Sequence, residues 1–148
     1  MPYFICPNCQ TRSFDEDGRE GLSHQAVGCE KCGFGFLFQL LEDYFPRSGA
    51  GFVACDAETR ILASGHGVFE VTGRLEEQLL GQEAVVGLHL TFADGDDPIS
   101  TTLEWGVRQL DKAATIVHAA GIEKPVIVDC FPAYDDDGGL LIALSPPA

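Results

Sequence analysis

Four cysteines near the N-terminus form two pairs of the same spacing, and this pattern restricts the chain more than any other feature. Cys6 and Cys9 form the first pair, Cys29 and Cys32 form the second, and nineteen residues lie between the pairs. A spacer of two residues lets one tight turn present two thiolates to a single ion. Four thiolates complete a tetrahedral zinc shell and leave no coordination position for water or substrate. The sequence therefore predicts one structural zinc site.

Redox chemistry and disulfides fit these thiols less well. A thioredoxin-like pair occurs once, at the start of a helix within an alternating strand–helix pattern, whereas here the pair is repeated and that pattern is absent. The N-terminus also lacks a basic segment followed by an apolar run. We therefore expect a cytoplasmic protein in a reducing compartment, where repeated pairs of this kind hold metal.

The first 46 residues are predicted to form a small unit around the metal. Ser13-Phe14 and the stretch "LSHQAVG" flank an acidic loop and are typical of two short strands, while phenylalanines alternate with Gly33 and Gly35 in a third strand candidate. Two CxxC turns joined by a short hairpin resemble the zinc ribbon family. The stretch "LFQLLEDYF" predicts a short helix, which the Pro-, Ser- and Gly-containing linker at 46–51 ends.

The charge of the chain disfavours nucleic acid as a partner. Its net charge is −14, and residues 1–50 contain four Lys and Arg against seven Asp and Glu. Because affinity for nucleic acid depends on basic side chains that neutralise phosphates, the acidic ribbon is expected to be repelled. A transcription-associated protein that binds nucleic acid through the ribbon is the alternative function.

Residues 51–148 predict a second domain of the α+β class. Apolar runs on either side of "DAET" indicate one hairpin, and runs on either side of "YDDDGG" indicate a closing hairpin. Between them, short helical pieces are punctuated by Gly73 and Gly81. Residues 98–121 predict one long amphipathic helix, because apolar residues recur there at spacings of three and four: Leu103, Val107, Leu110, Ala114 and Val117.

The second domain resembles the PAS family over about residues 51–145. The likeness lies in "DAETRILASGHGVFEVTGRLEEQLLGQ" and in the final hairpin "FPAYDDDGGLLIAL". The resemblance implies an antiparallel sheet with helices on one face, and a sensor that takes a small ligand between the two layers or associates with protein. One family strand, between the long helix and the last hairpin, has only "GIEK" available. The whole chain resembles small bacterial proteins in which a zinc ribbon precedes a PAS domain.

Three residues are the candidates for cofactor chemistry in the second domain. Some PAS domains bind haem through a histidine on the long helix, and His118 lies near the end of the predicted helix. The favoured interpretation of His118 is a half-exposed histidine that interacts with the helix dipole at the C-terminus of that helix. Flavin photochemistry in related domains uses a cysteine in an Asn-Cys-Arg-like helical motif, whereas Cys55 and Cys130 lie in strand segments. In PAS topology another strand separates those two strands, so the Cα atoms of the two cysteines are expected about 9.5 Å apart, too far for a disulfide. The two cysteines are therefore interpreted as small buried hydrophobic residues.

The surface of the predicted long helix suggests association. Trp105 and Ile116 lie about 200° and 220° around that helix from Leu103, opposite its apolar stripe, and large apolar groups there indicate a protein partner or self-association. No phosphate loop, nucleophile elbow or HExxH motif is present, so an enzyme is not expected. Apolar runs reach about half the ~20 residues of a membrane helix. A regulatory sensor or interaction module is therefore the predicted function.

Overall fold

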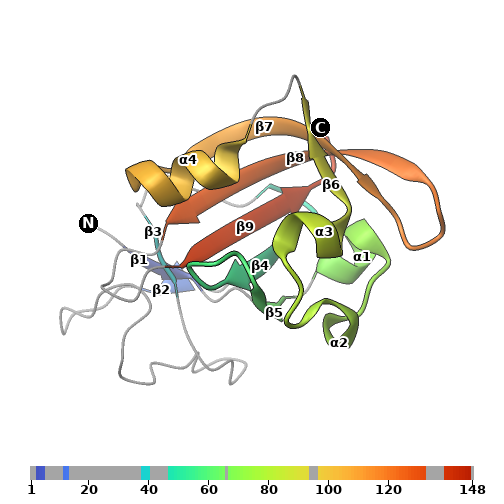
Figure 1. Cartoon of the computed structure of the whole chain (residues 1–148), viewed down its shortest axis with the longest axis horizontal. Coiled ribbons are helices and arrows are strands. Elements are labelled where there is room, and N and C mark those ends of the chain that lie inside the picture. The colour runs from blue at the N-terminus through green and yellow to red at the C-terminus, as the bar shows by residue number, and fades with distance from the viewer. Residues whose placement is uncertain are drawn as a thin grey trace.

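The described parts of the chain form two antiparallel sheets and four helices. The structure is a computed structural model, and it describes residues 3–5, 12–13, 38–40, 47–65, 67–93, 97–132 and 139–147. A small sheet has the strand order β2-β1-β3, and a large sheet has the order β5-β4-β9-β8-β7-β6. Figure 1 shows the helices of the described region gathered on the viewer's side of the large sheet.

The elements have the following bounds. The small sheet consists of β1 (Tyr3–Ile5), β2 (Arg12–Ser13) and β3 (Phe38–Leu40). The large sheet consists of β4 (Gly51–Cys55), β5 (Ile61–Ser64), β6 (Leu90–Phe92), β7 (Gln109–Val117), β8 (Glu123–Pro132) and β9 (Leu140–Ser145). The helices are α1 (Val68–Thr72), α2 (Glu76–Leu79), α3 (Ala84–Leu88) and α4 (Pro98–Trp105).

The hairpin predicted around "DAET" is confirmed as β4 and β5. The Asp56 carboxylate accepts hydrogen bonds from the backbone N–H groups of Glu58 and Arg60, at 2.9 Å each. Such a bond from a turn residue to its own backbone stabilises the reversal of the chain. The closing hairpin is likewise confirmed as β8 and β9, which pair from Ile127 opposite Ser145 to Pro132 opposite Leu140.

The short helical pieces are confirmed as α1, α2 and α3. Gly73 ends α1 in the left-handed conformation, with φ 72°, and its N–H donates to the Phe69 carbonyl. The Glu83 side chain accepts from the Val86 N–H and so caps the start of α3. Turn and cap chemistry is local, which is why the sequence indicated these pieces.

The long helix predicted over 98–121 is wrong. Helix α4 ends at Trp105, where Gly106 takes a left-handed φ of 65°, and the chain then forms strand β7. In β7 the inward residues are Ala114 and Ile116, two apart, as a strand requires. Pairing with β8 along most of its length outweighs the helical spacing of the apolar residues. Strand β7 is the family strand for which the predicted long helix left only "GIEK".

The core lies between the sheet and the helices. Inward side chains of the strands and the apolar faces of all four helices belong to one cluster of buried residues. Helix α4 lies across β7 and β8, while α1, α2 and α3 lie together beside β4, β5 and β6. The longest described helix, α4, spans eight residues, and none of the described helices is long and apolar enough to cross a membrane.

The helix predicted in "LFQLLEDYF" is also wrong at Phe38–Leu40, which form strand β3. This strand pairs antiparallel with β1, placing Phe38 opposite Ile5 and Leu40 opposite Tyr3. The predicted strand at Ser13 is confirmed by β2, whereas the one in "LSHQAVG" lies outside the described residues. The division into a unit at 1–46 and a domain at 51–148 stays a prediction.

Candidate functional site

The space between helices and sheet, where the family resemblance places a ligand, contains core side chains. Ile61 from the sheet, Leu79 from α2 and Leu88 from α3 are each at most 1% exposed and belong to the same cluster. Val128 and Ile142 meet this cluster from the middle of the sheet. Side chains from both layers thus contact each other directly in the described part of the domain.

A pocket of about 330 Å³ lies outside this core, beside the start of α1. Its described lining consists of Ser64, Gly65, Gly67, Phe69, Glu70, Arg74, Leu75 and Glu76. Phe69 and Leu75 are about half exposed, so the pocket has apolar walls at the surface. The Glu76 carboxylate accepts from the Ser64 N–H at 2.8 Å, which joins α2 to the end of β5.

Arg74, the cationic residue of this lining, is held by the protein backbone. One terminal nitrogen donates to the Val117 carbonyl at 2.6 Å and to the Thr72 carbonyl at 3.2 Å. Partial burial lowers the pKa of the Arg74 guanidinium, although a guanidinium remains charged in proteins. Arg74 therefore connects α1 to the end of β7.

His118, the weak ligand candidate, lies in the turn between β7 and β8. Its Nδ1 accepts from the Ala120 N–H at 3.0 Å, and its backbone carbonyl accepts from the Gly121 N–H. The imidazole packs on Gly73, where an added Cβ would approach the ring closer than 3.0 Å. The ring thus fills a place beside the end of α1, and the helix on which the sequence placed it does not form there.

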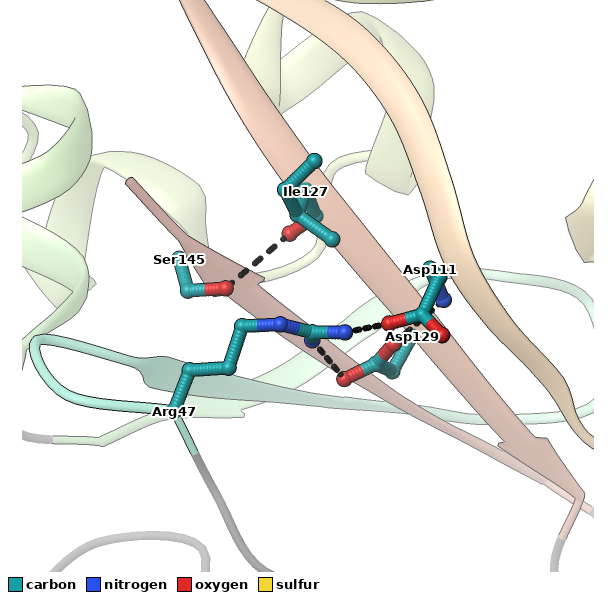
Figure 2. A network of polar contacts seen from close by, with 5 residues as sticks. All are labelled: Arg47, Asp111, Ile127, Asp129 and Ser145. Atoms are coloured by element: carbon teal, nitrogen blue, oxygen red, sulfur yellow. Dashed lines mark hydrogen bonds and ion pairs between the residues drawn. The ribbon is translucent and has the colours of Figure 1, made fainter. Parts of the chain in front are cut away.

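Arg47 and two aspartates form a polar network that the sequence analysis missed. The Arg47 guanidinium pairs with Asp129 of β8 and with Asp111 of β7, and Asp129 also accepts from the Asp111 N–H at 2.8 Å. Figure 2 shows the Arg47 side chain extending over the strands toward both carboxylates. Asp129 is 1% exposed, and a charge so buried requires a paired partner. A single aspartate within the apolar run "VIVDCF" was the signal available in the sequence.

Cys55 and Cys130 are confirmed as buried residues on strands separated by β9. Burial is the main cause that raises the pKa of the Cys55 thiol to about 12, with Asp56 and Glu83 adding to the effect. Burial likewise raises the pKa of Cys130, and Asp129 adds to it. Both thiols therefore stay protonated near neutral pH and are poor nucleophiles.

The predicted zinc ligands, Cys6, Cys9, Cys29 and Cys32, lie outside the described residues. The described strands nevertheless locate the chain on either side of them. Strand β1 ends immediately before Cys6 and β2 begins three residues after Cys9, and the two strands pair antiparallel. Within the described segments no group of three or more His, Cys, Asp or Glu side chains is placed to hold a metal.

The two predicted interface residues have different environments. Trp105, at the end of α4, is 75% exposed, as expected for a surface anchor. Ile116 is fully buried in the core because it points inward from β7. The prediction of Ile116 as an exposed residue was therefore wrong, and the reason is the strand that replaces the helix.

The six-stranded sheet and its helices have the fold of PAS domains in solved structures. The PAS domain of nitrogen regulation protein NR(II) from Vibrio parahaemolyticus aligns with a TM-score of 0.56 and 14% identity, over 68% of this chain and 92% of that one. A PAS domain from Colwellia psychrerythraea aligns with a TM-score of 0.51 and 21% identity, over 64% and 84%. The LOV domain of the blue-light photoreceptor Aureochrome1 aligns with a TM-score of 0.53 and 18% identity, over 66% of this chain and 81% of that one.

At this level of identity the likeness concerns the fold alone. No protein-family model matches the chain, and no curated protein matches it. The PAS-like fold accounts for the six-stranded antiparallel sheet with helices on one face.

Proposed function

We propose that the chain is a non-catalytic regulatory module that acts through protein association, with a PAS-like domain preceded by a structural zinc ribbon. The observation that carries this proposal is the direct packing of sheet and helix side chains where a small ligand would otherwise lie. With these residues packed against one another, the surface of the domain is the part that is available to a partner. The exposed Trp105 is the surface residue on which we base the association.

Neighbours of the same fold support a signalling role. One is a PAS domain of a nitrogen regulation protein, and another is the fungal blue-light photoreceptor Vivid in its light-state dimer. Photochemistry of the kind that needs a reactive cysteine is not proposed for this chain, because the described thiols, Cys55 and Cys130, are buried with raised pKa values.

The proposed zinc site is supported by the topology of the small sheet. Because Ile5 pairs with Phe38, the chain leaves β1 toward Cys6 at the same end at which it enters β3 from the side of Cys32. The chain segments that carry the two cysteine pairs therefore both connect to the same end of the small sheet. A unit of about 40 residues has too little apolar core to fold alone, so a metal would supply its stability.

Metal analysis of variants tests the zinc site. We expect about one zinc per chain in the wild type. The Cys9→Ser variant should lose that zinc, and a low concentration of protease should then cleave its first 46 residues. Cys55→Ala is the matched control, because it removes a buried thiol outside the pairs and should retain the metal. Unchanged zinc content and protease resistance in Cys9→Ser would exclude the assignment.

Analytical ultracentrifugation tests the association. Since a few aromatic anchors dominate most interfaces, Trp105→Ala should weaken association at least tenfold, whereas Glu104→Gln beside it should change it little. A wild-type protein that stays monomeric at high micromolar concentration and recovers no partner would refute this proposal. A shift of labelled DNA or RNA at low salt would instead favour the nucleic-acid alternative, and a co-purified chromophore or small molecule would favour a ligand sensor.

A further inference from the structure

The pocket beside the start of α1 contains two carboxylates without a counter-charge. Glu70 of α1 and Glu76 of α2 both line the pocket, and both residues are exposed. Within the described part of the chain, neither carboxylate is ion-paired. The Ser64 N–H donates to Oε2 of Glu76 at 2.8 Å and so holds this carboxylate at the pocket wall, while Oε1 has no donor in the described segments.

Arg74 lines the same pocket but does not neutralise these carboxylates. Its Nη1 donates to the backbone carbonyls of Val117 and Thr72, and among the described contacts no ion pair joins it to Glu70 or Glu76. Two carboxylates against one guanidinium leave the described lining with a net charge of −1. The whole chain carries −14, so the surrounding field also attracts cations. A positively charged group is therefore the ligand chemistry that this pocket favours.

The apolar walls of the pocket narrow this chemistry further. Phe69 and Leu75 each directly precede one of the two glutamates, and they are 52% and 48% exposed. An arginine side chain has an aliphatic stem that packs on apolar surface, and a planar guanidinium that stacks on an aromatic ring and binds carboxylates as a fork. The volume of about 330 Å³ is at the lower end of the range of ligand sites. Because its walls are half exposed, the pocket suits a side chain presented by a partner better than an enclosed small molecule.

We propose that this pocket binds an arginine side chain of a partner protein. The stem of the arginine packs on Phe69 and Leu75, and its guanidinium binds the carboxylates of Glu70 and Glu76. Figure 1 shows α1 and α2 on the right of the domain and α4, which ends at Trp105, on the left. The pocket is thus a second contact, with a partner chemistry of its own, and it goes beyond the association proposed for Trp105.

Titration of the full chain with matched peptides, followed by NMR of the backbone amides, tests the pocket. The probes are the blocked peptides Gly-Leu-Xaa-Leu-Gly, in which Xaa is arginine, its neutral analogue citrulline, or glutamate. We expect the arginine peptide to shift the amides of Phe69, Glu70, Leu75 and Glu76 and to bind about fivefold more tightly than the citrulline peptide. No shift at these amides, equal binding of the arginine and citrulline peptides, or a preference for the glutamate peptide would each overturn the proposal.

Charge-neutral variants locate the binding on the two glutamates. Glu70→Gln combined with Glu76→Gln should weaken binding of the arginine peptide about fivefold and leave the citrulline peptide unaffected, because the glutamine oxygen at position 76 can still accept from the Ser64 N–H. Glu77→Gln, in the same helix but outside the described lining, is the matched control and should change the affinity little. An equal loss in Glu77→Gln would show a general attraction to the negative chain and refute the site. Trp105→Ala should leave peptide binding unchanged, so this test fails or succeeds separately from the association through Trp105.

Discussion

At the residue scale, Gly73 is constrained by both its backbone and its neighbour. Its φ of 72° is left-handed, and a Cβ there would meet the His118 ring closer than 3.0 Å. Gly106 has a similar φ of 65° but no atom within 4 Å of an added Cβ, so it isolates the backbone effect. The two glycines therefore form a matched pair.

We expect Gly73→Ala to destabilise the fold by about 2–3 kcal/mol and Gly106→Ala by about 1 kcal/mol, because only the first adds a clash to the left-handed strain. Denaturant unfolding measures both. Combining Gly73→Ala with His118→Ala should recover part of the loss, since the clashing ring is removed. Equal effects of the two glycine substitutions would contradict the packing of His118.

Cys55 gives a prediction on pH dependence. Its pKa is about 12 in the folded chain against 9.0 for the free thiol, so the unfolded state releases this proton first as pH rises. The contribution of Cys55 to stability is present below pH 9 and is lost between pH 9 and about 12. We therefore expect the stability advantage of the wild type over Cys55→Ala to shrink by about 1 kcal/mol between pH 8 and pH 10. A constant difference in free energy of unfolding would count against the burial of this thiol.

At the element scale, the strand at Gln109–Val117 reverses two burial assignments. A helix over this region would bury Val117 and expose Ile116, whereas in β7 Ile116 is fully buried and Val117 is 38% exposed. We expect Ile116→Ala to cost about 2–4 kcal/mol and Val117→Ala less than about 1 kcal/mol, as measured by thermal or denaturant unfolding. A larger loss of stability for Val117→Ala than for Ile116→Ala would contradict the strand and favour the predicted helix.

This region also shows what a single sequence can and cannot predict. The hairpins, the short helices and the glycine stop at Gly73 depend on turns and caps within a few residues, and the sequence indicated them correctly. The apolar spacing that runs from Leu103 in α4 through Leu110 and Val117 in β7 fits one continuous helix, and the contact that decides for a strand is the pairing of β7 with β8. The predicted zinc ligands depend on local spacing, whereas Arg47 and Asp129 are 82 positions apart and meet only through the fold.

At the scale of the whole molecule, the large sheet is buried on both faces although its described helices cover only one. A parallel sheet is usually covered on both sides, but an antiparallel sheet can leave one side to water. Here the face turned away from the helices carries Phe52, Leu141 and Phe131, so the sheet has the composition of a central layer. The core between the sheet and the helices is formed by described residues, and the opposite face of the sheet carries a second set of buried apolar side chains.

The last prediction therefore concerns a fragment that contains residues 47–148 alone. Burial of a large apolar side chain contributes about 1.5–3 kcal/mol, so exposing Phe52, Leu141 and Phe131 would cost on the order of 5 kcal/mol, comparable to the stability of a whole domain. We expect the fragment to fold only when a second copy covers the face, so its unfolding midpoint should rise with protein concentration over about a hundredfold range. The full chain, measured in parallel, should show less dependence. A fragment that is monomeric and as stable as the full chain would mean that residues 1–46 contribute nothing to this face.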